Sequence, residues 1–185
     1  LEFLKGMNAG LQQRHPTAIL IAEDSTSFPK VTAPVEYGGL GFDYKWDLGW
    51  MNDTLDYFKK TSDERRENLG KLTFSMMYAW NEHYILPFSH DENVHGKATI
   101  VQMYGEYEGK FPQARALYLY MAIHPGKMLD FMGNEFAQLR EFDESREQDW
   151  MLLKYPNHDD FHRYRRALNE AYLANEAFWS REYDP

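Results

Sequence analysis

The sequence lacks cysteine altogether, so it can form neither a disulfide framework nor a thiolate metal site. It also lacks any apolar run approaching the ~20 residues that a membrane-spanning helix requires. Cationic charge is scarce, because 20 Lys and Arg face 29 Asp and Glu and give a formal net charge of −9. The one basic cluster, Arg163 to Arg166, falls among acidic residues on an expected helix and is interpreted as a solvated face. Since phosphate binding depends on clustered cations, we expect neither a nucleic-acid nor a membrane partner.

What the sequence has in excess is aromatic residues, which make up 16% of the 185 positions. Aromatic faces pack against the apolar C–H faces of sugar rings, so the excess suits a carbohydrate site. The same residues equally fill a large core, and composition does not choose between these uses. The length fits one domain, and the balance of 43% hydrophobic and 26% charged residues is typical of a globular protein.

The chain begins inside an expected helix, since residues 1–8 show no capping or start signal. A chain that begins in the middle of an element is expected to be a piece of a longer protein. The lack of a signal peptide therefore says little about localisation.

Short apolar runs typical of buried parallel strands alternate with longer segments of helical spacing. Strands are expected at 17–22, 42–48, 85–89 and 127–132, and helices at 1–13, 50–60, 72–84, 114–123 and 159–178. Residues 28–41 are expected to form a loop and 61–70 a polar connection, and Pro87 counts against a central strand because it has no N–H to donate. The pattern predicts an α/β protein with a parallel sheet, either an open doubly wound sheet or half of a (β/α)8 barrel.

Acidic residues follow three of the four expected strands: Glu23-Asp24, Asp91-Glu92 and Glu135. Ligands of parallel α/β folds bind outside the carboxyl ends of the strands, so these side chains are expected to face one substrate. Paired carboxyl groups serve retaining glycosidic chemistry, one as nucleophile and one as acid, and a third can stabilise the positive transition state. The alternative is that these acids cap helices or lie in loops.

Metal binding is a competing use of the same region. His90, Asp91, Glu92 and His95 are potential ligands, but their spacing matches no HExxH-type motif, and two His five residues apart do not share a helix face. A metal-dependent hydrolase using His90, Asp91 and Glu135 stays open as an alternative.

An ordered set of motifs resembles the bacterial-type glycogen (1,4-alpha-glucan) branching enzymes of the alpha-amylase superfamily. The motifs are Ala-Glu-Asp-Ser-Thr at 22–26, Pro-Val-Glu-Tyr-Gly-Gly-Leu-Gly-Phe-Asp at 34–43, Trp-Asp-Leu-Gly-Trp-Met-Asn-Asp-Thr at 46–54, Leu-Pro-Phe-Ser-His-Asp-Glu at 86–92, Val-His-Gly-Lys at 94–97, Phe-Met-Gly-Asn-Glu-Phe at 131–136 and Asp-Trp at 149–150. Each short motif is weak by itself, but their order covers nearly the whole chain.

The resemblance implies that residues 1–185 are the fifth to eighth strands of a catalytic (β/α)8 TIM-type barrel, in a cytoplasmic enzyme of glycogen biosynthesis. It implies that Glu23 is the general acid/base, that Asp91 stabilises the transition state, and that His90, Glu92 and His95 contact the substrate. Such an enzyme cleaves an alpha-1,4-glucan and transfers the freed chain to a 6-hydroxyl to make an alpha-1,6 branch, with no metal or organic cofactor. Asp24 is the rival for the acid/base role, and Glu23 is preferred because it directly follows the apolar run.

The sequence departs from the family at several places. Asp24 stands where many relatives have a second Glu, and Asn93 where Val is common. The family's nucleophile, an Asp in a Gly-Phe-Arg-like motif after the fourth strand, has no counterpart here, nor does the C-terminal β-sandwich. We therefore expect a fragment that is inactive alone and that associates with the N-terminal half of its barrel or with itself. A non-catalytic glucan-binding module is the further alternative.

Overall fold

Within the residues that the structure describes, four strands form one parallel sheet in the order β1-β2-β3-β4. The structure is a computed structural model and describes residues 1–105, 107–181 and 183. The strands are β1 (Ile21–Ala22), β2 (Tyr44–Trp46), β3 (Tyr84–Phe88) and β4 (Lys127–Asp130). The α-helices are α1 (Glu2–Arg14), α2 (Leu48–Lys59), α3 (Ser62–Glu67), α4 (Gly70–Thr73), α5 (Tyr107–Ile123) and α6 (Pro156–Ala174). Short 3₁₀ helices are η1 (Val35–Tyr37), η2 (Phe74–Met77), η3 (His90–Asn93), η4 (Ile100–Met103), η5 (Asn134–Phe136), η6 (Trp150–Lys154) and η7 (Glu176–Phe178).

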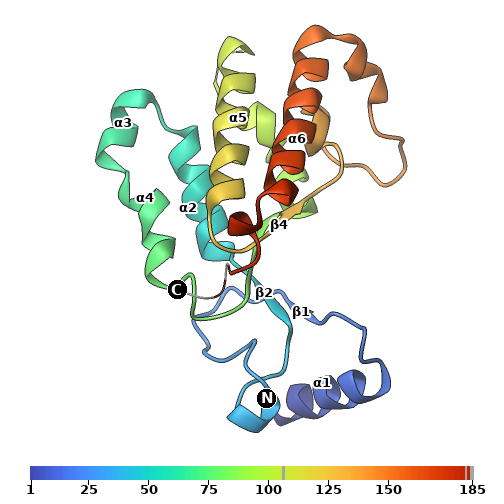
Figure 1. Cartoon of the computed structure of the whole chain (residues 1–185). Helices are drawn as coiled ribbons and strands as arrows, with labels where there is room; N and C mark the ends of the chain where they lie inside the picture. The colour runs from blue at the N-terminus through green and yellow to red at the C-terminus, as the bar shows by residue number, and fades with distance from the viewer. Residues whose placement is uncertain (106, 182, 184–185) are drawn as a thin grey trace.

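The helices gather mainly on one side of the sheet, where α2, α5 and α6 stand together, while α1 lies apart from them (Figure 1). The expected parallel α/β architecture is confirmed. Crossover helices connect β2 to β3 and β3 to β4, as parallel strands require. The connection from β1 to β2 contains only η1 besides irregular backbone, which confirms the loop expected at 28–41.

The strand register separates two faces of the sheet. Ala22 pairs with Lys45, Lys45 with Tyr84, and side chains alternate along each strand. Ala22, Lys45, Tyr84, Leu86 and Phe88 therefore share the face that carries α2 and α5, here called the helix face. Residues between them point to the opposite side, here called the far face, where Ile21 is 45% exposed.

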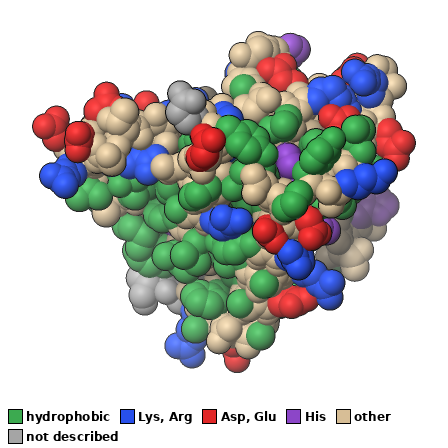
Figure 2. Space-filling model, turned by 90° about the horizontal axis from the view of Figure 1, so that it is seen from above, with side chains coloured by type: hydrophobic (Ala, Val, Ile, Leu, Met, Phe, Trp, Pro, Cys, Tyr) green, Lys and Arg blue, Asp and Glu red, His purple; other side chains and the backbone are tan. Residues whose placement is uncertain are grey.

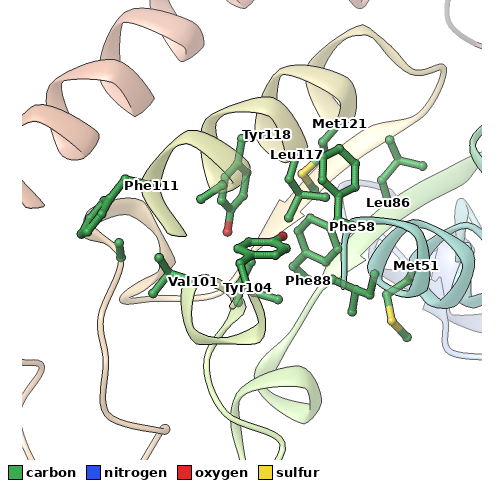
Figure 3. Packing of buried hydrophobic residues seen from close by; sticks show 14 of the residues in the cluster. Met51, Phe58, Leu86, Phe88, Val101, Tyr104, Phe111, Leu117, Tyr118 and Met121 are labelled. Carbon is green, nitrogen blue, oxygen red and sulfur yellow. The ribbon is translucent and has the colours of Figure 1, made fainter. Parts of the chain in front are cut away.

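The main core lies on the helix face. Leu86 and Phe88 of β3 are fully buried, and they meet Phe58 of α2 and Leu117 and Met121 of α5 in one cluster (Figure 3). Burying a large apolar side chain contributes about 1.5–3 kcal/mol, so this cluster anchors both helices to the sheet. Other apolar side chains remain at the surface, and Figure 2 shows many of them gathered on one face with charged residues spread around them.

The first expected strand is shorter and more exposed than its sequence suggested. The run at 17–22 forms a strand only at Ile21–Ala22, and Ile19 and Ile21 are 65% and 45% exposed. Only Ala22 is buried, against Val31 and Leu40 of the following loop. The prediction of a strand buried on both faces was wrong here, because the described residues cover β1 on its helix face only.

The helix expected at 72–84 is also wrong. α4 and η2 occupy only 70–77, and Tyr84 already belongs to β3. The Tyr120 hydroxyl donates to the Leu72 carbonyl at 2.7 Å. In a continuing α-helix, that carbonyl would accept from the backbone N–H four residues later. Conversely, α3 was missed in the polar segment 61–70, although Thr61 and Glu64 form the capping box that marks its start.

Two further helices differ from expectation at their ends. α5 begins at Tyr107 instead of residue 114 and contains Pro112, which interrupts the sequence signal because proline disfavours helix interiors. α6 begins earlier than expected, with Pro156 in its first turn, where proline is favoured, and ends at Ala174 before η7.

Pro87 lies in the central strand β3 despite its missing N–H. The Ile85 carbonyl accepts a hydrogen bond from the Asp47 N–H at 2.8 Å. Pro87, two residues further on, faces the same neighbour, but the chain there has already turned into α2 at Leu48. No partner in the ladder is therefore lost, and the prediction of a strand at 85–89 is confirmed within one residue.

The basic cluster of α6 is solvated only in part. Arg163 and Arg166 have side chains 67% and 77% exposed, but Arg165 is buried. Its guanidinium binds Asp130 at 2.7 Å and lies 3.7 Å from the centre of the Tyr118 ring. The interpretation of the cluster as a solvated face was wrong for Arg165, which attaches α6 to the end of β4.

Among the described residues, no helix combines the length and the apolar character needed to cross a bilayer.

Candidate active site at the strand ends

The expected site residues lie where the strands end. Glu23 follows β1, His90 and Asp91 follow β3 after Ser89, and Glu135 lies five residues after the end of β4. Neighbouring strands are roughly 4.8 Å apart, so β1 and β3 are separated laterally by about two such spacings with β2 between them. In the sheet register, Ala22, the last residue of β1, is aligned through Lys45 with Tyr84, the first residue of β3. β3 therefore extends further in the carboxyl direction than β1.

Glu23 and Asp24 have different surroundings. In the described part of the chain, Glu23 is exposed and takes part in no hydrogen bond or ion pair. Asp24 accepts from the Lys45 ammonium at 2.9 Å and from both the N–H and the hydroxyl of Thr26 at 3.0 Å. Burial works to raise the pKa of Asp24, but these donors outweigh it and lower the pKa. Because Lys45 lies on the helix face, Asp24 is held there as a paired anion, whereas the Glu23 carboxyl is exposed.

His90 and Asp91 form the one contact between expected site residues. His90 Nε2 lies 3.3 Å from Asp91 Oδ1, and both side chains are about half exposed, at 51% and 49%. The His90 ring also lies 6.0 Å from the ring of Phe131, measured between centres. The pair thus presents an imidazole and a carboxylate to solvent at the end of β3.

Glu92 has a different position from its neighbours, because it is buried at 7% exposure. Its carboxylate accepts from the Ser89 N–H at 2.8 Å and from the Ser89 hydroxyl at 3.0 Å. Asn93 donates to the Ser89 carbonyl at 2.8 Å. Glu92 was expected to contact substrate, yet it binds the chain's own turn and fixes the η3 helix that carries His90 and Asp91.

His95 lies further along the same loop and is exposed. Both His95 and Ala98 have positive φ, at 59° and 67°, a conformation that costs about 1–3 kcal/mol for non-glycine residues and clusters at functional sites. The Glu141 carboxylate accepts from the N–H groups of Gly96 at 3.1 Å and Ala98 at 2.8 Å. These two donors lower the pKa of Glu141. No motif in the sequence marks Glu141, which lies in an irregular loop.

Glu135 is turned back on its own loop, since its carboxylate accepts from the Gly133 N–H at 2.7 Å. Across the described residues, no three His, Asp or Glu side chains are grouped closely enough to hold a metal ion. His90, Asp91 and Glu135 are therefore not brought together in the way that the metal-hydrolase alternative needs.

Two other strand-end carboxylates were not singled out from the sequence. Asp130, the last residue of β4, binds Arg165, Asn134 and the Tyr118 hydroxyl. Burial raises the pKa of Asp130, and the Arg165 cation works against that rise. Asp47 follows β2 and caps α2, accepting from the Trp50 N–H at 2.8 Å. Both carboxylates are engaged in structural contacts, and Asp47 is buried, whereas Glu23 and Asp91 are more exposed.

No family model matches the sequence, but curated relatives do. The chain is 49% identical over 181 residues to the 1,4-alpha-glucan branching enzyme GlgB of Fusobacterium nucleatum, covering 97% of this chain and 30% of that protein. It is 46% identical over 186 residues to the enzyme of the same name from Bacillus caldolyticus, covering 100% of this chain and 28% of that protein. The chain thus spans less than a third of the length of these relatives.

Solved structures of similar fold are much more distant in sequence. The type III pullulan hydrolase from Thermococcus kodakarensis matches with a TM-score of 0.66 and 18% identity, over 95% of this chain and 31% of that one. An alpha-amylase from H. orenii matches with a TM-score of 0.60 and 16% identity, over 96% of this chain and 40% of that one. These likenesses show that the parallel α/β sheet is folded like a segment of alpha-amylase-type proteins.

Proposed function

Because the chain belongs to the family of 1,4-alpha-glucan branching enzymes, we propose that it supplies part of the catalytic centre of such an enzyme. The centre cleaves an alpha-1,4-linked glucan and transfers the released chain to a 6-hydroxyl, forming an alpha-1,6 branch with retention. The observation that carries the proposal is the 49% identity over 97% of the chain. The free Glu23 and the half-exposed His90–Asp91 pair at the strand ends fit it.

The four strands are proposed to be the fifth to eighth of a (β/α)8 barrel. In a barrel, consecutive strands lie side by side, whereas a doubly wound sheet reverses its strand order at a switch point. The order β1-β2-β3-β4 contains no reversal. The exposed Ile21 on the far face also fits a barrel interior that further strands would cover.

Glu23 is proposed as the general acid/base. It protonates the glycosidic oxygen as the alpha-1,4 bond breaks, and it later removes the proton from the 6-hydroxyl of the acceptor. A residue in this role must exchange protons with substrate, which the unpaired Glu23 can do and the Lys45-bound Asp24 cannot.

Asp91 is proposed to stabilise the oxocarbenium-like transition state, since its carboxylate places negative charge where positive charge develops. His90, held at 3.3 Å from Asp91, and the exposed His95 are placed to donate to sugar hydroxyls. Glu92 is proposed to act indirectly, by fixing the turn beneath His90 and Asp91.

The nucleophile that attacks the anomeric carbon is proposed to lie outside residues 1–185. Glu23 and Asp91 are already proposed as acid/base and as transition-state stabiliser. The other carboxylates at the strand ends make contacts within the fold: Asp24, Asp47, Glu92, Asp130 and Glu135. Without the nucleophile, the 185-residue chain by itself forms no covalent intermediate.

The test compares the 185-residue chain with the parent enzyme that contains it. Each is incubated with amylose, and new alpha-1,6 linkages are counted by proton NMR. We expect branching by the parent and none by the chain alone. Branch formation by the isolated chain would contradict the proposed division of the catalytic centre, and a parent that only hydrolyses amylose would contradict the transfer reaction.

A further inference from the structure

The His90 side chain has a second neighbour besides Asp91, the ring of Phe131. The two ring centres lie 6.0 Å apart, with an angle of 52° between the ring planes. Phe131 directly follows β4, and its N–H donates to the Phe88 carbonyl at 2.9 Å. The sheet therefore fixes the backbone of Phe131, but the orientation of its ring depends on the side chains that it packs against.

Phe142 packs against the Phe131 ring. The ring centres lie 4.8 Å apart and the planes are perpendicular, at 89°, which is one of the arrangements that aromatic pairs prefer at this separation. Phe142 lies in the irregular segment between η5 and η6. The rings of His90, Phe131 and Phe142 thus follow one another from the candidate active site to the loop after β4.

The backbone of Phe142 is bound to the turn that carries His90. Its N–H donates to the Asn93 carbonyl at 2.8 Å. Asn93 is 4% exposed, and its side-chain amide donates to the Ser89 carbonyl at 2.8 Å. Ser89 directly precedes His90, so Phe142 is connected to His90 by hydrogen bonds as well as through the Phe131 ring.

The residues that precede Phe142 are also held in place. Glu141 accepts from two backbone N–H groups of the loop after η3. The Arg140 guanidinium lies 3.1 Å from the Asp149 carboxylate and binds it. With its own N–H bound as well, Phe142 presents its ring from a backbone that polar contacts fix on the side of η3 and on the side of η6.

His90 needs such a support because its side chain is half exposed, at 51%. An exposed side chain changes between staggered rotamers unless packing restricts it. A group that donates to substrate must be held close to its productive position by neighbours whose own rotamers are locked. The Asp91 carboxylate binds the Nε2 end of the imidazole, and Phe131 lies beside the ring.

We propose that Phe142 is a positioning residue for His90. It fixes the orientation of the Phe131 ring, and Phe131 then restricts the His90 imidazole to the rotamer that contacts Asp91. Phe142 acts through Phe131 and need not touch the substrate. That the restricted imidazole contacts a glucan rests on the proposed function.

The first test measures the nuclear Overhauser effect between the ring protons of His90 and Phe131 in the 185-residue chain. We expect this effect in the wild type, its loss in Phe142→Leu, and its retention in Phe142→Tyr, which keeps the ring. Phe178→Leu is the matched control, because it removes a ring that stacks on Tyr172 in a different region, with centres 6.3 Å apart. The amide spectra of all variants check that the chain stays folded.

The second test measures kcat/KM for amylose in the parent enzyme. Phe142→Leu is expected to lower it about tenfold, since a small misplacement of a substrate contact reduces turnover strongly, and Phe142→Tyr is expected to stay near wild type. In a His90→Ala background, Phe142→Leu should have little further effect, because a residue that acts through His90 has nothing left to position. Equal losses in both backgrounds would reveal a merely structural role and overturn the proposal.

The two tests separate this inference from the proposed function. An effect between His90 and Phe131 that depends on Phe142, in a chain whose parent forms no branches, would support the positioning of His90 and contradict the branching reaction. An effect that persists unchanged in Phe142→Leu would overturn the positioning role even if the parent forms branches.

Discussion

The two halves of the sheet differ in how they are held. β3 and β4 share four registered pairs and are covered on the helix face by α5 and α6. β1 and β2 share two pairs and are joined by a loop. The β3–β4 half is therefore the more tightly packed of the two. The β3–β4 half carries His90 and Asp91 beyond the end of β3, while Glu23 follows β1 and is exposed.

The largest expected effect concerns the free carboxyl of the β1–β2 half. In the parent enzyme, Glu23→Gln is expected to lower kcat for branching by roughly 10²–10⁴-fold, the usual contribution of general acid–base catalysis. The amide keeps the size of the side chain but cannot transfer the proton. The measurement is the rate of alpha-1,6 bond formation on amylose.

Asp24→Asn is the matched control for that variant, because Asp24 is adjacent but bound to Lys45. Its effect on kcat is expected to be much smaller. A greater loss with Asp24→Asn than with Glu23→Gln would reverse the assignment of the acid/base.

The second prediction compares the stability of the two halves. Phe88→Ala removes a fully buried ring from the β3 core and is expected to lower the free energy of unfolding by about 3–5 kcal/mol. Ile21→Ala at the 45% exposed position of β1 is expected to change it by about 0.5 kcal/mol or less. Urea unfolding of both variants measures the difference, and equal losses would show that β1 is packed as tightly as β3.

The third prediction tests how α6 is attached to β4. Arg165→Met leaves the buried Asp130 without its cation and is expected to cost about 3 kcal/mol of unfolding free energy, because breaking one side of a buried pair strands the other charge. Arg163→Met, at an exposed position of the same helix, serves as control with an expected change near zero. An equally small effect at Arg165 would mean that apolar packing alone holds α6.

The fourth prediction concerns the loop that follows η3. Glu141→Gln removes one of two backbone contacts to Gly96 and Ala98, since the amide offers a single carbonyl oxygen. Amide hydrogen exchange at Gly96 and Ala98 is expected to rise, while exchange in α5 stays unchanged. In the parent, KM for amylose is expected to rise more than kcat falls. Unchanged exchange at both amides would show that the strained loop is held by other contacts.

The smallest expected effect is pH dependence in the core. Burial lowers the pKa of His124, and its Nε2 lies 2.7 Å from the Ser75 hydroxyl. The unfolded chain therefore binds a proton more readily than the folded chain. The stabilising contribution is present above the unfolded pKa of about 6.5 and is lost as the pH falls below it.

Urea unfolding of wild type and His124→Gln between pH 7.5 and about 5.5 checks this. The wild type is expected to lose more stability across that range. Parallel pH profiles for the two proteins would contradict the prediction.

The sequence predicted the parallel sheet and the approximate positions of its four strands, because apolar runs and their alternation with helical segments are local signals. The sequence-based prediction of helix ends failed where contacts between distant residues influence the backbone conformation. The Tyr120 hydroxyl binds the Leu72 carbonyl beside the end of α4, and Pro112 lies inside α5 although proline disfavours helix interiors. The places of the candidate site residues in the fold were predicted in part. Glu23, His90 and Asp91 follow their strands as expected, but the buried position of Glu92 and the contacts of Glu141 depend on residues far away in the chain or on turn geometry.

The most direct test of the account is to locate the covalent intermediate in the parent enzyme. The Glu23→Gln variant is treated with alpha-glucosyl fluoride, whose leaving group needs no acid, while the missing base slows release of the glycosyl group. Mass spectrometry of the digested protein then identifies the labelled peptide. We expect a glycosylated Asp outside residues 1–185. A label on Asp91, or on any other residue of this chain, would contradict the claim that these strands supply the acid/base and the stabilising carboxylate but not the nucleophile.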